Sequence, residues 1–159
     1  MSSLPSGPLR ERFDALRAQY PGEMTPSLVL PLLHAAQDAK GHVTDTDAAE
    51  IAAYIGVPAM QVVEALHWYS MFRRTPPGRH VVQVCRNIAC ALRGAEGLLA
   101  VLQRELGVTA GQTTADGRIT LETVECMASC GTAPAMCVDG HYHENLDEAR
   151  VIQLVKELP

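Results

Sequence analysis

Hydrophobic residues in the first half of the chain recur at helical spacing. The pattern of every three to four positions, typical of a helix with one buried face, first connects Leu9, Phe13, Leu16 and Tyr20. Further helices are predicted at about Pro26–Lys40, with Thr25 as its N-cap, at about Thr46–Ile55, and from Pro58 to about Ser70. Gly41 and Gly56 end the first two of these. Residues 1–70 are therefore predicted to form a small helical bundle.

The second half of the chain changes its pattern. His80–Val84 is β-branched and compact, as expected of a buried strand, and a helix is predicted from about Ala91 to Leu106. Asp116-Gly117 and Asp139-Gly140 are typical of hairpin turns. The segments 135–138 and 141–143 read as short strands, and 119–125 reads as a strand or the approach to a loop. Asn145 is expected to cap a last helix from Leu146 to about Glu157.

This order of elements predicts a two-part, mixed α/β chain. Residues 80–159 read as a strand, a helix, a strand, a hairpin and a helix, which is typical of helices packed on a small mixed sheet, as in a thioredoxin-like fold. Residues 71–79, with Pro76-Pro77-Gly78, read as a linker. The fold class is thus α+β or α/β, with a helical bundle at 1–70 and a sheet domain at 80–159.

Composition and charge narrow the possible partners. The 159 residues carry a formal charge of −5, which disfavours binding to nucleic acid. The longest strongly apolar stretch, 28–33, is far shorter than the ~20 residues of a membrane span. The N-terminal sequence has no apolar core of a secretory signal, so we expect a reducing, cytoplasmic or mitochondrial-matrix location. In such a compartment cysteines are more often ligands or nucleophiles than disulfides.

The cysteines carry the most specific signal. Cys85 and Cys90 form a C-x4-C pair after the first predicted strand, and Cys126 and Cys130 form a C-x3-C pair after a later one. Two pairs from two loops can supply four thiolates to one site, and a [2Fe–2S] cluster takes two on each iron. Cys137 stands alone in a strand and is expected to be a buried core thiol.

Zinc remains an alternative at this point. Structural zinc also takes four thiolates, although its ligand pairs usually read C-x2-C, and the 35 residues between the pairs suit it poorly. A thioredoxin-type C-x-x-C is absent, and the odd number of cysteines argues against a disulfide framework. Spacing alone favours the iron–sulfur site over a zinc-stabilised protein-binding module.

At these residues the sequence resembles a known family. The runs QVCRNIACALRGAE and GQTTADGRITLETVECMASCGTAPAM, with LPLLHAAQDAKG and YSMF upstream, are similar to the thioredoxin-fold [2Fe–2S] subunit of NADH:quinone oxidoreductase, complex I. Related subunits occur in NAD-linked hydrogenases and formate dehydrogenases, and membership of one of those remains the first alternative. The family often has glycine where Ala128 stands, which predicts strain or altered hydrogen bonding in that loop.

The resemblance implies a cofactor and partners. Cys85, Cys90, Cys126 and Cys130 match the family's ligands to one [2Fe–2S] cluster. The implied partner is the FMN- and NADH-binding flavoprotein subunit, with further subunits of a complex peripheral to the membrane. FMN and NAD are then expected in the partner. This chain is expected to be an electron-transfer subunit without catalytic residues of its own, which acts only within the complex.

Overall fold

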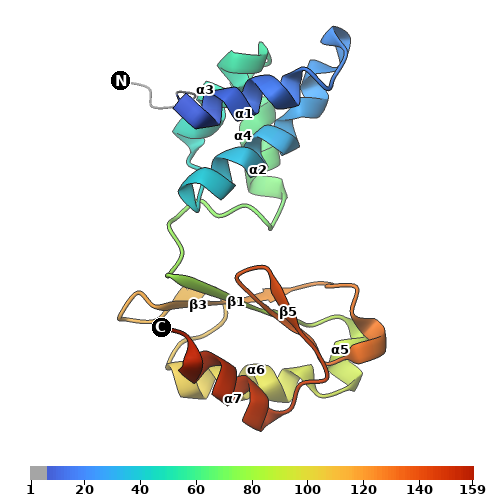
Figure 1. Cartoon of the computed structure of the whole chain (residues 1–159), viewed down its shortest axis with the longest axis vertical. Coiled ribbons are helices and arrows are strands. Elements are labelled where there is room, and N and C mark those ends of the chain that lie inside the picture. Colours follow the sequence, from blue (N-terminus) through green and yellow to red (C-terminus); the bar gives the residue numbers. More distant parts are fainter. Residues whose placement is uncertain (1–6) are drawn as a thin grey trace. The chain divides into compact units, whose positions relative to one another are not determined.

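The chain divides into two compact units in a computed structural model, which describes residues 7–159 (Figure 1). One unit ends at Pro76 and the other spans Pro77–Pro159. The first six residues of the predicted bundle lie outside the described residues. Within residues 7–159, no helix is long and apolar enough to cross a membrane.

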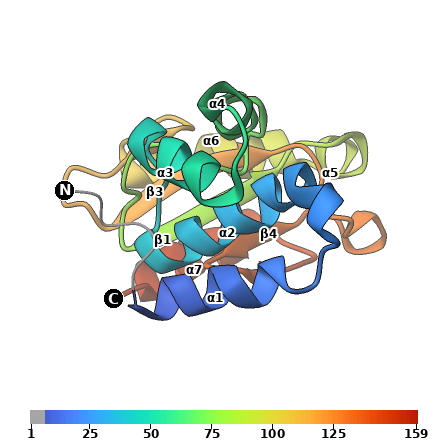
Figure 2. The same ribbon diagram turned by 90° about the horizontal axis from the view of Figure 1, so that it is seen from above.

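The first unit consists of packed helices. Its elements are α1 (Gly7–Arg17), the 3-10 helix η1 (Gly22–Leu28), α2 (Val29–Lys40), α3 (Asp45–Ile55) and α4 (Ala59–Trp68). Viewed from above, α1 lies alongside α2 (Figure 2). The helices enclose one apolar core, whose largest fully buried side chains are Phe13, Leu28, Leu32, Leu33, Val43, Ile51, Val62 and Leu66.

Two helix starts differ from the sequence prediction. Pro26 lies inside η1, and the hydroxyl of Thr25 donates to the Gly22 carbonyl oxygen at 2.6 Å, so the α-helix begins only at Val29. The next helix begins at Asp45 rather than Thr46, because Thr44 is its N-cap. Gly41, with φ 79°, ends α2 as predicted.

The start of the segment 71–79 packs with the helices. Phe72 is buried in the helical core, and the Val43 amide donates to the Arg73 carbonyl oxygen at 2.7 Å. At the other end, the Gly78 amide donates to Thr120 Oγ1 at 2.6 Å in the second unit. A Cβ on Gly78 would lie 3.1 Å from the backbone of Arg118, so a glycine suits this close approach.

The second unit is a five-stranded mixed sheet with the order β2-β3-β1-β4-β5. Its central pair, β1 (His80–Cys85) and β3 (Ile119–Val124), is parallel, and the other pairs are antiparallel. β2 (Gln112–Thr113) forms one edge of the sheet. On the other side, β4 (Met136–Val138) and β5 (His141–His143) form a hairpin, with β5 at the edge. The predicted mixed α/β layer is therefore confirmed, with β2 as an additional short strand.

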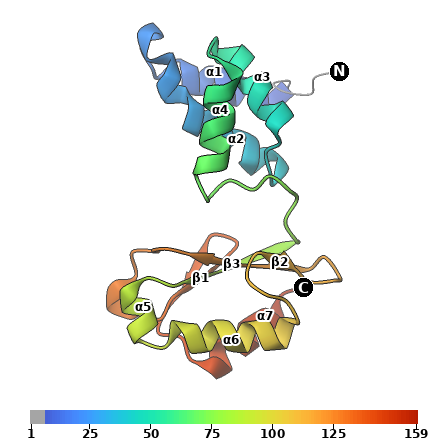
Figure 3. The ribbon, with the colours of Figure 1, turned by 180° about the vertical axis from the view of Figure 1, so that it is seen from behind.

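Helices α6 (Ala95–Leu106) and α7 (Glu148–Glu157) cover one face of the sheet (Figures 1 and 3). Their apolar sides and the sheet enclose a second core, formed by Val82, Val84, Leu98, Val101, Leu102, Ile119, Leu121, Met136, Val138, Val151 and Val155, among others. The sequence predicted one helix over 91–106. The structure instead has a short helix, α5 (Ile88–Leu92), and then α6, separated at Gly94 with φ 94°.

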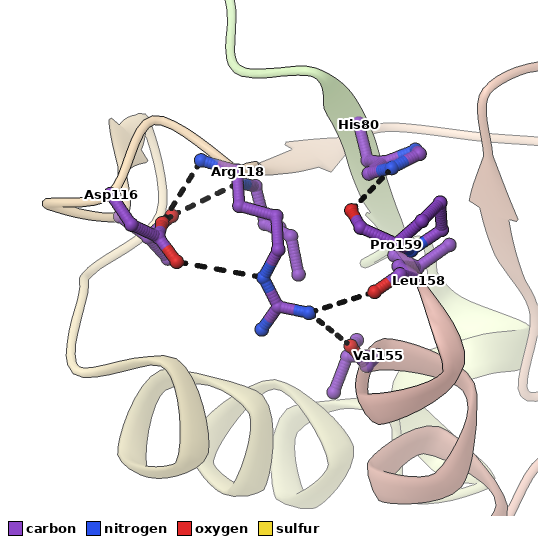
Figure 4. Close-up of polar contacts among 8 residues, drawn as sticks. His80, Asp116, Arg118, Val155, Leu158 and Pro159 are labelled. Atoms are coloured by element: carbon purple, nitrogen blue, oxygen red, sulfur yellow. Dashed lines mark hydrogen bonds and ion pairs between the residues drawn. The ribbon is translucent and has the colours of Figure 1, made fainter.

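The last helix, α7, begins at Glu148 rather than Leu146 and ends at Glu157 as predicted. Asp147, rather than Asn145, is its N-cap, since the Asp147 carboxylate accepts the Arg150 amide at 2.8 Å. At its end, the Arg118 guanidinium donates to the main-chain oxygens of Val155 and Leu158 at 3.3 and 3.0 Å (Figure 4). Such donors satisfy carbonyl groups that a helix C-terminus leaves without partners.

Candidate functional site

The two cysteine pairs follow neighbouring parallel strands. Cys85 is the last residue of β1 and is in register with Val124, the last residue of β3, and Cys126 follows two residues later. Parallel strands end at the same edge of a sheet, so the loops after β1 and β3 leave it side by side. The topology thus brings together two segments separated by the whole α5–α6–β2 connection.

The first loop turns at once into α5. The Asn87 side chain accepts the Ile88 amide at 2.9 Å and caps this helix of one and a half turns. Cys90 lies on its inner side and is 2% exposed, whereas Ile88 and Leu92 are 73% and 82% exposed. Cys85 is also buried, so the first pair faces the interior of the unit.

The second loop keeps its thiols at the surface. Cys126 and Cys130 are exposed, and Cys130 opens the 3-10 turn η2 (Cys130–Thr132). Ala128 has a positive φ of 60°, a conformation in which its amide donates to Cys126 Sγ at 3.3 Å. The strain or altered hydrogen bonding expected at Ala128 is therefore present as a left-handed alanine whose amide points to sulfur.

Small residues surround the buried thiols. Cys85 and Cys90 pack in one cluster with Ala95, Met127, Ala133, Ala135 and Cys137. Burial raises the pKa of the Cys90 thiol, and its contact with Cys85 and the nearby charge of Cys130 raise it further. The Ala135 amide, which hydrogen-bonds to the Cys90 sulfur, acts in the opposite direction. Two of the other predicted site cysteines therefore act on the ionisation of Cys90.

The sequence profile of the thioredoxin-like [2Fe–2S] ferredoxin family matches residues 13–159. The chain belongs to this family. The match includes both units of the chain and all four site cysteines. It confirms the resemblance found in the sequence at the level of the family.

Family members of known name are similar over most of the chain. An NADH-quinone oxidoreductase subunit of Rhizobium meliloti is 40% identical over 148 residues, covering 93% of this chain and 87% of that protein. NADH-quinone oxidoreductase subunit 2 of Thermus thermophilus is 35% identical over 142 residues, covering 89% and 78%. The mitochondrial NADH dehydrogenase [ubiquinone] flavoprotein 2 of Dictyostelium discoideum is 34% identical, covering 92% and 60%.

A solved structure shares the fold. The NAD+-reducing [NiFe]-hydrogenase in its air-oxidized state contains a chain that matches with a TM-score of 0.70 and 24% identity. The match covers 82% of this chain but only 22% of the hydrogenase chain. At that identity the likeness shows the fold alone.

The donor chemistry suits the family's cluster. Four thiols in two chelating pairs are the donor set of a [2Fe–2S] cluster, and amides of Ala128 and Ala135 already point at two of the sulfurs. The Cys126 sulfur accepts its hydrogen bond from Ala128, within the same loop. Across residues 7–159, no group of three or more His, Cys, Asp or Glu side chains is placed to hold one metal ion.

The charges beside the thiols are partly paired. Arg86, which follows Cys85, lies 3.3 Å from the carboxylate of Glu125, which precedes Cys126, and both side chains are exposed. This ion pair connects the two cysteine loops at the surface, where such a pair contributes little to stability. Arg93 is also exposed, so neither arginine is buried against the thiols.

Sequence reasoning missed two features of the site. The break between α5 and α6 orients Cys90 inward, and its signal was Gly94, a typical residue just after a helix end. The second is Glu144, which directly follows β5 and whose carboxylate contacts the second cysteine loop. No local pattern marks that contact. Cys137 lies buried in β4, as expected of a core thiol, and His141 and His143 lie on the edge strand β5.

Proposed function

We propose that this chain is an electron-transfer subunit of an NADH:quinone oxidoreductase, and that Cys85, Cys90, Cys126 and Cys130 hold one [2Fe–2S] cluster. The observation that carries the proposal is the position of both cysteine pairs at one end of the parallel pair β1 and β3, in a chain that matches the family along most of its length. Relatives named as subunits of NADH-quinone oxidoreductase support the choice of complex.

The protein's part in this function is to hold and shield the metal centre. When bound, a [2Fe–2S] cluster takes up and releases single electrons. Cys85 and Cys90 would hold it from the buried side, and Cys126 and Cys130 from the exposed side. Because burial and neighbouring thiols keep a proton on Cys90, binding of the cationic iron would release that proton.

The proposed partner is the flavoprotein subunit that binds FMN and NADH, with which this chain would exchange single electrons. The two exposed thiols and the exposed apolar side chains of α5 leave the cluster side of the unit accessible to a second protein. A subunit that carries electrons needs no substrate pocket of its own, and hydride chemistry would belong to the flavin.

Anaerobic purification with iron and sulfide assays, followed by EPR after dithionite reduction, tests the cluster. We expect two irons and two sulfides per chain and a paramagnetic signal on one-electron reduction. A colourless protein with about one zinc per chain would make the zinc-stabilised binding module the better account.

Two alanine variants test the assignment of the ligands. Cys126→Ala should abolish the EPR signal, because it removes a thiolate from one iron. Cys137→Ala is the matched control: this thiol packs as a small apolar side chain, and the cluster signal should survive. Loss of the signal in the Cys137 variant alone would contradict the assignment. Co-purification with the flavoprotein, or with hydrogenase subunits, tests which complex the chain serves.

A further inference from the structure

The Glu144 side chain hydrogen-bonds to the residues on both sides of Cys130. Thr132 Oγ1 donates to Glu144 Oε1 at 2.5 Å, and the Ser129 hydroxyl also hydrogen-bonds to this carboxylate. These bonds, that of Thr132 first, hold the pKa of Glu144 below its ordinary value. The carboxylate is therefore charged at neutral pH, and it bridges the position before Cys130 and the position two residues after it.

The backbone beside Glu144 contacts the same loop. The Asn145 amide donates to the Thr132 carbonyl oxygen at 2.7 Å, and the Leu146 amide donates to the Pro134 carbonyl oxygen at 3.2 Å. Leu146 is itself buried in the core beneath the sheet, and Asn145 has a positive φ of 50°. The connection between β5 and α7 is thus fixed to the core on one side and to the cysteine loop on the other.

The 3-10 turn η2, which contains Cys130, has few internal contacts that would hold it in place. Within it, the Thr132 amide donates to the Ser129 carbonyl oxygen at 3.1 Å, while the Thr132 hydroxyl lies 3.3 Å from that oxygen and makes its shorter bond to Glu144. Cys130 is exposed, so no packing fixes its side chain. Hydrogen bonds to a carboxylate are stronger than those between neutral groups, so Glu144 supplies the strongest side-chain contact that this turn has.

We propose that Glu144 is a positioning residue for Cys130, whose carboxylate fixes the turn that presents this thiolate and whose charge acts on the reduction potential of the centre. The inference rests on the proposed function, because it assigns Glu144 a role toward the same cluster. Hydrogen bonds behind the ligands commonly orient them and tune the metal. A fixed negative charge nearby also disfavours the addition of an electron.

Three variants of the full-length chain separate the two effects. Glu144→Ala removes the acceptor and the charge, Glu144→Gln keeps an acceptor oxygen without the charge, and Glu148→Ala removes an exposed carboxylate from the start of α7 as a matched control. Each is reconstituted with iron and sulfide. The measurements are the half-life of the visible absorption in a chelator, the EPR spectrum and the midpoint potential.

We expect Glu144→Ala to lose iron about tenfold faster than the parent chain and to give a shifted EPR spectrum. For Glu144→Gln, the half-life of the visible absorption in the chelator should stay within about twofold of that of the parent chain. The midpoint potential should move in the positive direction, since only the charge is lost. Glu148→Ala should match the parent chain. Ser129→Ala combined with Thr132→Val removes the donors instead and should lose iron as Glu144→Ala does, which covers the case of a Glu144 variant that fails to fold.

Failure of this proposal can be told apart from failure of the proposed function. If the parent chain holds the cluster while Glu144→Ala and the Ser129–Thr132 double variant keep its half-life, spectrum and potential, the role of Glu144 is overturned and the function stands. If the parent chain takes up no iron and sulfide on reconstitution, the proposed function itself fails.

Discussion

Ala128 adopts a backbone conformation that L-amino acids avoid. Its φ of 60° belongs to the left-handed region, which costs a residue with a Cβ about 1–2 kcal/mol. The benefit is the amide of Ala128, which donates to Cys126 Sγ at 3.3 Å. One strained residue thus orients a hydrogen-bond donor toward a proposed ligand.

Ala128→Gly should relieve this strain. Glycine removes the whole cost of the left-handed conformation, but the greater freedom of the unfolded chain lowers the free energy of unfolding by about 0.4–1 kcal/mol. The free energy of unfolding should therefore rise by about 0.5–1 kcal/mol in total. Urea unfolding of the metal-free protein, followed by circular dichroism, measures it. Ala115→Gly is the control at an exposed turn position without positive φ, and it should not stabilise. An equal gain in both variants would show that strain at Ala128 is not the cause.

At the scale of elements, the sequence predicted periodic segments better than their ends. The apolar spacing of the helices and the β-branched run of β1 indicate buried faces directly, and both are found. The starts of α2 and α7 and the split at Gly94 depend on turns: Pro26 continues a 3-10 helix, and Asn145 has a positive φ. The contact of Glu144 with Thr132 joins distant segments, so only the fold reveals it.

The start of α3 is a capping box. The Thr44 hydroxyl accepts the Asp47 amide, and the Asp47 carboxylate accepts the Thr44 amide at 2.9 Å. Asp47 is buried and also lies 2.6 Å from Lys40 Nζ at the end of α2. Burial acts to raise the pKa of this carboxyl, but the hydrogen bonds from Lys40 and Thr44 outweigh it and hold the pKa below the ordinary 3.8.

Asp47→Ala should destabilise the helical unit by about 2–3 kcal/mol, because it removes the cap and leaves Lys40 without its partner. A lowered pKa means that the contribution is present above about pH 4 and is lost as the pH falls below that value. Urea unfolding at pH 7 and at pH 3, followed by circular dichroism, should show the variant and parent chain converging at the lower pH. Thr46→Ala, at an exposed position of the same turn, should change stability by less than about 0.5 kcal/mol. A constant difference at both pH values would contradict the role of the charged carboxylate.

At the scale of the whole molecule, the chain is two units joined by a short exposed segment. Phe72 belongs to the helical core and Gly78 is bonded to the sheet unit, which leaves the exposed residues 74–76 between them. The sequence predicted a longer linker at 71–79. Pro76-Pro77-Gly78 marks the junction, but no local pattern reveals that Phe72 packs into the core of the helical unit.

Brief trypsin digestion should cut first at the bond between Arg74 and Thr75, because exposed connecting segments are preferred sites of proteolysis. Mass spectrometry should find two fragments that meet there and then persist, and the proposed cluster should stay with the C-terminal one. Arg74→Gln should delay the cut. A first cleavage within residues 80–159 would show that the sheet unit, rather than the junction, is the less stable part.

Because β1 pairs with β3, the site combines two segments of the chain that are synthesised at different times. Synthesis runs from the N-terminus, so Cys85 and Cys90 leave the ribosome before Cys126, from which 35 residues separate Cys90. The loop that holds Cys130 is then fixed only when residues 144–146 are available to bond to it. A growing chain at first presents half of the proposed ligands, so we expect the proposed cluster to be loaded after translation, from the side where Cys126 and Cys130 are exposed.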